Sequence, residues 1–288
     1  MAIRQITIIG TGLIGGSFAL ALKRRKFAGR IVGCDREAVL EKAQMRGAID
    51  AGFSDPGAAV RGSQVVMLAT PVLAIVDLVE RVGPVLPAES LLTDVGSTKS
   101  LVVERAQKVF GNNAGKRFLA GHPVAGKELS GVDYADPDLF QNAAWFLTPL
   151  PGQNIHQGLF AEFAGWIDQV GARVALLPAD EHDRLCAWIS HLPQMISTAL
   201  AATLVEEFGE EAPLLAAGGR ALLEMTRISA SPYSMWRDIA ISNKKNLADA
   251  LLKLEQRLAH IRENLGTRQL AEEFEQAHQL RKMPGKKT

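Results

Sequence analysis

A glycine-rich segment near the N-terminus limits the possible fold more than any other feature of this sequence. The stretch ITIIGTGLIGG joins an apolar run to a helical pattern, and Gly10, Gly12 and Gly15 have the spacing G-x-G-x-x-G. In a dinucleotide-binding sheet these glycines permit a tight turn, close approach of a pyrophosphate, and close packing of helix on strand. Leu13 and Ile14 open that helix, whose N-terminal amides face the anion. The segment therefore predicts a dinucleotide site.

A second apolar run, RIVGC, is followed by an acidic residue at the distance such a site requires. Asp35 lies twenty residues beyond Gly15, where a carboxylate meets the ribose hydroxyls of NAD and repels a 2′-phosphate. The guanidinium of Arg36 leaves NADP open. Thr70 and Pro71, after a third apolar run, complete the predicted cofactor set. A glycine-rich turn without a ligand is the alternative, and the position of the acid argues against it.

The alternation of apolar runs with helical patterns predicts an α/β fold with a largely parallel sheet. The runs are ITIIG, RIVGCD, QVVMLATP, LLTDVGS, FLAGHP, AAWFLTPL and ARVALLP. After Pro178 the spacing is helical throughout, with Asp180 as the expected N-cap of the first helix. We therefore expect a dinucleotide-binding domain over residues 1–178 and an all-helical domain over residues 179–288.

Composition narrows the class of partner. With a formal net charge of +1 and 22% charged residues, the chain has no overall field that favours nucleic acid or a membrane surface. No apolar run approaches the length of a membrane span. Cys34 and Cys186 are far apart and outside any CxxC or Cys/His sequence cluster, so neither a metal site nor a disulfide is expected, and the cytoplasm is the expected location.

The last long helical pattern has a heptad-like row of apolar residues. The row comprises Leu247, Leu251, Leu254, Leu258, Ile261 and Leu265. It fits equally a helix packed into its own domain and a helix at a subunit interface.

The segment LAGHPVAG places a histidine at the end of an extended element. Pro123 removes a backbone donor and keeps the preceding His122 out of the α region. In a doubly wound sheet, ligands bind beyond the carboxyl ends of the strands, where the loops ATP, DVGSTK and GHPVAG would meet. His122 is therefore expected on the same rim as the nicotinamide. Ser97, in DVGSTK, is expected there too, as a helix cap, as a second hydroxyl of the site, or as both.

Five motifs in order carry a family resemblance: GTGLIGGS, TDVGSTK, GHPVAGKELSG, EHDRLCAWISHLP and MTRISASPYSMWRDI. The chain resembles the prephenate and arogenate dehydrogenases of tyrosine biosynthesis. The resemblance implies a Rossmann-type NAD(P)-binding domain, an all-helical substrate and dimerisation domain, and a homodimer. It also implies hydride transfer from a ring carbinol carbon to NAD(P)+ with loss of the ring carboxylate, giving 4-hydroxyphenylpyruvate or tyrosine. No fused chorismate mutase segment is expected.

The resemblance also assigns roles to single residues. His122 matches the family's catalytic histidine, and a neutral imidazole suits a base that acts on a secondary alcohol. Ser97 matches the serine that shares the hydrogen-bond network of that hydroxyl. Arg227, in MTRIS, matches the arginine that binds the anionic substrate, for which a guanidinium fork is well suited.

The segment WISHLPQ adds candidates for substrate binding. Pro193 removes the hydrogen bond to the carbonyl of Ile189 and predicts a kink that suits a pocket wall. His191 and Gln194 are the substrate-binding candidates of this wall. Many relatives have histidine in place of Gln194, so both the pyruvyl side chain of prephenate and the alanyl side chain of arogenate stay open. His182, on the same helix, is expected to be structural.

Two other functions are weighed against this one. A two-domain dehydrogenase of the β-hydroxyacid type would use a lysine on the helical domain, where this chain offers His191. A dinucleotide-sensing or purely dimeric binding protein would not require His122, Ser97 and Arg227 together. Both alternatives are therefore disfavoured.

Overall fold

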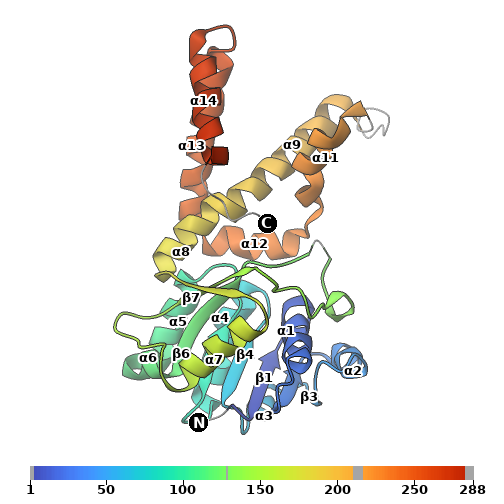
Figure 1. Cartoon of the computed structure of the whole chain (residues 1–288), viewed down its shortest axis with the longest axis vertical. Helices are drawn as coiled ribbons and strands as arrows, with labels where there is room; N and C mark the ends of the chain where they lie inside the picture. Colours follow the sequence, from blue (N-terminus) through green and yellow to red (C-terminus); the bar gives the residue numbers. More distant parts are fainter. Residues whose placement is uncertain (1–2, 128, 210–216, 283–288) are drawn as a thin grey trace.

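The computed structural model describes residues 3–127, 129–209 and 217–282 and divides into a sheet-containing part and a helical part. Figure 1 shows the helical part beyond one end of the strands, with the helices of the N-terminal part on both faces of the sheet. The predicted fold class, an α/β dinucleotide-binding domain followed by helices, is confirmed.

The sheet has eight strands in the order β3-β2-β1-β4-β5-β6-β7-β8. The strands are β1 (Gln5–Ile9), β2 (Arg30–Cys34), β3 (Ala51–Phe53), β4 (Val65–Leu68), β5 (Leu91–Asp94), β6 (Phe118–Pro123), β7 (Ala144–Thr148) and β8 (Arg173–Leu176). All neighbours are parallel except β6 and β7. The chain reverses direction along the sheet between β1 and β4, which is where this fold binds nucleotides.

All seven predicted strand runs form strands, and β3 was not predicted. It is a three-residue edge strand without a buried residue, so its sequence AGF lacks the apolar run that marks the other strands. The prediction for β6 is confirmed: His122 is extended and next to last in that strand.

Helices pack on both faces of the sheet. The N-terminal part contains α1 (Leu13–Arg24), α2 (Glu37–Met45), α3 (Pro56–Ala59), α4 (Val72–Val82), α5 (Ser100–Phe110), α6 (Ala114–Arg117) and α7 (Gly158–Gln169), with short 3-10 turns η1 (Gly83–Val85), η2 (Gly111–Asn113) and η3 (Val132–Tyr134). One core cluster lies between the sheet and α1, α2 and α7, and a second lies between the sheet and α3, α4 and α5.

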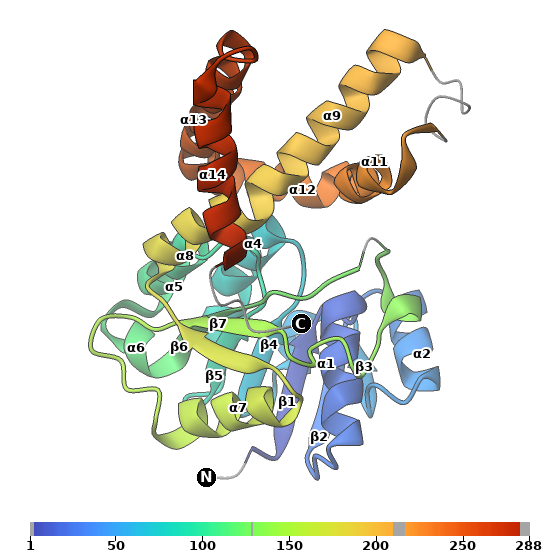
Figure 2. The ribbon, with the colours of Figure 1, turned by 45° about the horizontal axis from the view of Figure 1, so that its top comes forward.

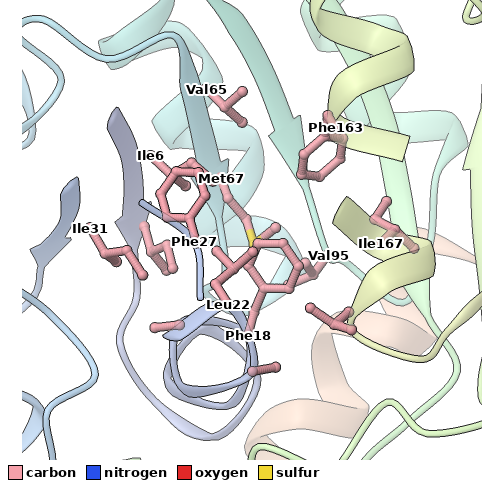
Figure 3. Packing of buried hydrophobic residues seen from close by; sticks show 14 of the residues in the cluster. Ile6, Phe18, Leu22, Phe27, Ile31, Val65, Met67, Val95, Phe163 and Ile167 are labelled. Atoms are coloured by element: carbon pink, nitrogen blue, oxygen red, sulfur yellow. The ribbon is translucent and has the colours of Figure 1, made fainter. Parts of the chain in front are cut away.

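Figure 3 shows the first of these clusters around α1. Phe18 and Leu22 project from α1 towards Met67 of the central strand β4, and Phe163 of α7 closes the cluster from the other side. The ring of Phe18 lies 5.5 Å from that of Trp145 on β7. Because α1 follows the glycine-rich turn directly, this packing fixes the N-terminus of α1 against the sheet.

The helical part begins with three consecutive helical segments, α8 (Ala179–Cys186), the π-helix η4 (Ala187–His191) and α9 (Leu192–Phe208). Pro193 is in the first turn of α9, where it has no N–H to donate, and the π-helix ends just before it with the N–H of Leu192 donating to the carbonyl oxygen of Ala187. Asp180 is in the first turn of α8, whose N-cap is Pro178, so the expected N-cap was wrong. The helix begins two residues earlier than an N-cap at Asp180 would place it, because Pro178 has the non-helical backbone of a cap, with ψ of 149°.

The remaining helices are α11 (Gly219–Thr226), the 3-10 turn η5 (Arg227–Ala230), α12 (Tyr233–Ser242), α13 (Lys244–Glu263) and α14 (Arg268–Lys282). In Figures 1 and 2, α13 and α14 form one projecting pair, and Figure 1 shows α11 in contact with α9. Leu247, at the start of the apolar row on α13, is buried, whereas Leu258 and Leu265 are 56% and 64% exposed. Of the described helices, none combines the length and the apolar character that crossing a bilayer requires.

Candidate active site

The glycine-rich turn has the geometry that the sequence predicts. Gly10 has a φ of +95°, and a Cβ there would lie 2.5 Å from the carbonyl oxygen of Ala69. A Cβ on Gly15 would lie 2.1 Å from the carbonyl oxygen of Gly10, so helix and turn pack too closely for any side chain. A Cβ on Gly12 would meet no atom within 4 Å. The turn thus has no room for side chains at Gly10 and Gly15, whereas the space next to Gly12 is open. This open space fits a pyrophosphate in contact with the backbone.

Asp35 lies at the end of β2, beside this turn. The backbone amides of Thr11 and Arg36 each donate to its carboxylate at 2.8 Å. The carboxylate is half-buried, and Arg36 is exposed. Thr70 and Pro71 follow β4, the strand next to β1, and Pro71 caps α4. The hydroxyl of Thr70 is buried and has no hydrogen-bond partner among the described residues, so it is available to a ligand.

A buried ion pair holds the neighbouring strand ends together. The Nζ of Lys99 donates to Asp94 at the end of β5, and both side chains are fully buried. The same Nζ donates to the carbonyl oxygen of Gly121 at 2.7 Å. Since Gly121 precedes His122, Lys99 and Asp94 fix the backbone from which the histidine projects. Sequence reasoning did not single out this pair, although the motif TDVGSTK contains both residues.

His122 contacts a second histidine from the helical part. Its Nδ1 lies 2.9 Å from the Nε2 of His182 on α8. The Nδ1 of His182 lies 2.9 Å from the Oδ1 of Asp183. A carboxylate only accepts hydrogen bonds, so His182 carries its proton on Nδ1 and its Nε2 accepts from His122. His122 therefore carries its own proton on Nδ1, and its Nε2 keeps the free lone pair that a base requires.

Asp183 anchors this chain of side chains to the sheet. Its two carboxylate oxygens accept from the backbone amides of Lys99, at 2.7 Å, and Ser100, at 2.9 Å. Burial raises the pKa of Asp183, but the hydrogen bonds from His182, Ser100 and Lys99 outweigh it and hold the pKa below its usual value. The carboxylate thus stays charged and fixes the tautomer of His182.

The environment keeps His122 neutral. Burial is the main cause that lowers its pKa well below the usual 6.5, and the nearby His182 and Lys99 lower it further. Burial also lowers the pKa of His182, against the opposing effect of Asp183. Both imidazoles are therefore uncharged at neutral pH, which is the state in which His122 can accept a proton.

Two further predicted site residues, Ser97 and His191, lie in the loop after β5 and at the end of the π-helix. Ser97 is half-buried in the loop after β5, on the strand-end rim where it was expected. His191 ends the π-helix, its Nδ1 lies 3.2 Å from the Nδ2 of Asn243, and its ring lies 6.0 Å from that of Trp236. Burial lowers the pKa of His191 to about 4.

Gln194 and Arg227 are connected through the backbone of η5. Gln194 is buried, and its Nε2 donates to the carbonyl oxygen of Ile228 at 2.9 Å. Arg227 precedes Ile228 at the start of η5 and is exposed in the single chain. The structure therefore places Arg227 at the start of η5, next to the backbone carbonyl to which Gln194 of α9 donates.

Sequence reasoning did not connect three residues with the centre. His182, which was expected to be structural, contacts His122 directly. Cys186 was placed outside any Cys/His cluster, yet its Sγ lies 3.4 Å from the Nε2 of His182. Asn243 binds both the carbonyl oxygen of Asp183 and His191. The i, i+4 spacing of His182 and Cys186 was the available signal, since it puts both on one helix face.

Both parts of the chain match a known protein family. A family model described as the nucleotide-binding domain of prephenate dehydrogenase matches residues 18–176, and one described as its dimerization domain matches residues 178–280. The prephenate dehydrogenase of Lactococcus lactis subsp. cremoris is 36% identical over 277 residues, which cover 88% of this chain and 72% of that protein.

Solved structures agree with this result. A crystal structure of prephenate dehydrogenase from A. aeolicus, in complex with hydroxyphenyl propionate and NAD+, has a TM-score of 0.87 and 30% identity over 98% of both chains. A crystal structure of Synechocystis arogenate dehydrogenase has a TM-score of 0.79 and 28% identity over 96% of this chain and 99% of that one. Because the two family models follow each other along nearly the whole length, the chain belongs to the prephenate dehydrogenase family.

Proposed function

We propose that this protein oxidatively decarboxylates prephenate or L-arogenate with hydride transfer to NAD(P)+, giving 4-hydroxyphenylpyruvate or tyrosine. The observation that carries the proposal is the contact between the Nδ1 of His122 and the Nε2 of His182. It leaves the other nitrogen of a buried, neutral imidazole free, at the strand-end rim where this fold holds the nicotinamide. Family membership decides against the β-hydroxyacid alternative and against a sensor without chemistry.

His122 supplies the base of the reaction. Its Nε2 accepts the proton of the ring carbinol, and Ser97 shares the hydrogen bonds of that hydroxyl. The bound nicotinamide supplies the acceptor for the hydride. The charge that develops on the imidazole is stabilised through His182 by the fixed carboxylate of Asp183. Loss of the ring carboxylate as carbon dioxide is driven by the aromaticity that the ring gains.

Arg227, His191 and Gln194 form the proposed substrate-binding set. The guanidinium of Arg227 suits a carboxylate of the substrate, and the residue is exposed in the single chain. The low pKa of His191 makes it a neutral hydrogen-bonding group. Gln194 is neutral as well, so neither His191 nor Gln194 offers a positive charge to a second carboxylate of the substrate. This combination leaves both prephenate and L-arogenate as substrates to be tested.

NAD is the proposed cofactor, with NADP as the alternative. The residues present fit a nicotinamide dinucleotide, because Gly12 is open, Thr70 has an unpartnered buried hydroxyl and Asp35 stands at the end of β2. The carboxylate of Asp35 suits the ribose hydroxyls of NAD and repels a 2′-phosphate. Arg36 is exposed beside it and supports the alternative.

We further propose a homodimer through the helical part, with a domain boundary between residues 178 and 179. Apolar side chains exposed in the single chain support the dimer. They include Leu223, Met225, Tyr233, Ile241, Leu252, Leu258, Leu265 and Phe274 on α11 to α14. An isolated domain rarely leaves so many large apolar side chains in water. Two unbonded, buried cysteines suit a cytoplasmic location.

A steady-state assay of four combinations tests the function. Purified protein is mixed with prephenate or L-arogenate and with NAD+ or NADP+, and the formation of reduced nicotinamide is followed. We expect turnover in at least one combination, with NAD+ preferred. Absence of turnover in all four, with cofactor binding intact, would refute the proposed reaction.

A further inference from the structure

Three side chains of types that can bind metal ions, one of them the candidate base His122, converge in the centre. The Nδ1 of His122 lies 2.9 Å from the Nε2 of His182, and the Sγ of Cys186 lies 3.4 Å from that Nε2 and 3.9 Å from that Nδ1. All three residues are buried. His182 and Cys186 are four residues apart on α8 and share a helix face, whereas His122 comes from β6. The cluster thus bridges the sheet and the helical part.

The three separations fit a metal ion. A point equidistant from the three atoms lies about 2.0 Å from each, which is close to zinc–nitrogen bonds of about 2.0–2.1 Å and slightly short of zinc–sulfur bonds of about 2.3 Å. A small outward shift of the sulfur satisfies all three lengths. The carboxylate of Asp183 holds the other ring nitrogen of His182, as carboxylates do behind the histidine ligands of zinc sites.

We propose that His122, His182 and Cys186 form a binding site for Zn2+ that inhibits the enzyme. Two imidazoles and a thiolate are a ligand set that zinc prefers, and three protein ligands leave a fourth position for water. On binding, the Sγ–H bond of Cys186 breaks, its proton leaves to solvent, and the sulfur bonds to the metal. The proton on the Nδ1 of His122 is lost to solvent, and another is taken up on its Nε2. One proton is therefore released for each ion bound.

The expected inhibition follows from this change of tautomer. A neutral imidazole has one lone pair, so a metal on the Nδ1 of His122 leaves its Nε2 protonated and unable to accept the proton of the substrate. Zinc binding and base catalysis thus require opposite tautomers of the same ring. This step rests on the proposed function of His122, whereas the binding of the ion does not.

Binding is tested first, without any enzyme assay. The full-length protein is titrated with Co2+, in buffer free of thiols and chelators, and the sulfur-to-cobalt charge-transfer absorption is recorded. Zn2+ affinity is measured by competition with a chromophoric chelator. The variants are Cys186→Ser and Cys186→Ala, and Cys34→Ser is the matched control, because Cys34 is the other cysteine of the chain and is also buried. Melting curves of all variants establish that they are folded.

We expect one equivalent of Zn2+ per chain and a charge-transfer band in the wild type and in Cys34→Ser. Both Cys186 variants should lose the band and bind Zn2+ at least about 10-fold more weakly, since serine and alanine offer no soft ligand. A band that persists in folded Cys186 variants, or equal Zn2+ affinity in all proteins, overturns the site.

Inhibition is tested next, on the combination of substrate and cofactor that turns over. One equivalent of Zn2+ should lower the kcat of the wild type and of Cys34→Ser at least about 10-fold, and a chelator should restore it. In each Cys186 variant the same amount of Zn2+ should change kcat by less than about 2-fold relative to that variant without metal. If Zn2+ binds through Cys186 but leaves the kcat of the wild type unchanged, the inhibitory role is wrong. Activity without metal judges the proposed function separately, since it does not depend on the site.

Discussion

The Nδ1 of His122 lies 2.9 Å from the Nε2 of His182, and this contact joins strand β6 of the sheet to α8, the first helix of the helical part. The orientation of the candidate base is therefore set by the second part of the chain. Asp183 completes the connection, because it binds the ring of His182 and the backbone at the start of α5. Any movement of α8 relative to the sheet would change the position and the tautomer of His122.

The first prediction concerns the base itself. His122→Asn should lower kcat by about 100-fold or more, because the amide has no group of suitable basicity to take the carbinol proton. The Kd for the dinucleotide should stay within about 2-fold, since the glycine-rich turn and Asp35 are untouched. Steady-state kinetics and cofactor titration measure the two quantities. A kcat close to that of the wild type would remove His122 from the mechanism.

The second prediction separates a positioning role of His182 from a merely structural one. His182→Leu removes the acceptor that holds the proton of His122 on Nδ1 and should lower kcat about 10- to 100-fold, with KM little changed. His182→Gln offers an amide oxygen in place of Nε2 and should retain most of the activity. Equal losses in two variants of equal melting temperature would show that the acceptor is unimportant.

The fold was largely predictable because its signals are local. The glycine spacing and the apolar runs of the strands are each contained in a few residues, and β3 was missed where such a run is absent. His122 was predicted to be extended at a strand end because its neighbouring proline requires it. These features depend on backbone sterics and burial, which sequence patterns report directly.

The centre of the site was less predictable because it depends on contacts between distant segments. His182 is sixty positions from His122, and the backbone amides that hold Asp183 are more than eighty positions away from it. Nothing near His182 in the sequence indicates that α8 packs against the ends of β5 and β6. The buried Lys99 pairs with Asp94, five positions away, and only the fold shows that it also supports His122 through Gly121.

The third prediction concerns the choice of cofactor. Asp35→Ser should shift the ratio of kcat/KM for NADP+ and NAD+ at least about 10-fold towards NADP+, because the repulsive carboxylate goes and Arg36 stays. The serine hydroxyl can still accept from the amide of Thr11, which the carboxylate binds at 2.8 Å. Adding Arg36→Ala to this variant should reverse much of the shift. If this kcat/KM ratio is the same in both variants as in the wild type, the adenosine ribose does not lie at the end of β2.

The fourth prediction concerns stability in acid. His191 is buried and has a pKa of about 4 in the folded state, against a usual value of 6.5. The unfolded chain therefore binds the extra proton first, and stability present above pH 6.5 is lost as the pH falls from 6.5 to about 4. The loss is on the order of 3 kcal/mol for this residue.

Thermal unfolding measured across this pH range tests the fourth prediction. His191→Gln should show a smaller decrease of Tm on acidification than the wild type. The matched control is His156→Gln, because His156 is exposed and should leave the pH dependence of Tm unchanged. Parallel curves for the wild type and His191→Gln would mean that His191 does not stay neutral in the folded protein.

The last prediction concerns the substrate anion. If Arg227 holds a carboxylate by a bidentate pair, Arg227→Ala should raise KM about 10- to 100-fold, as expected for a charged hydrogen-bonded contact of about 1.5–3 kcal/mol. Arg227→Lys should recover only part of this, because a point charge does not reproduce the fork.

Arg227 begins η5, to which Gln194 is bound through the carbonyl of Ile228, so a purely structural role would instead lower Tm and kcat together. Ser229→Ala serves as the control for loosening η5 without removing the cation, because the Oγ of Ser229 donates to the carbonyl oxygen of Thr226. Measuring Tm, kcat and KM on the same preparations separates the two roles, and an unchanged KM for both prephenate and L-arogenate in Arg227→Ala would show that the substrate is anchored elsewhere.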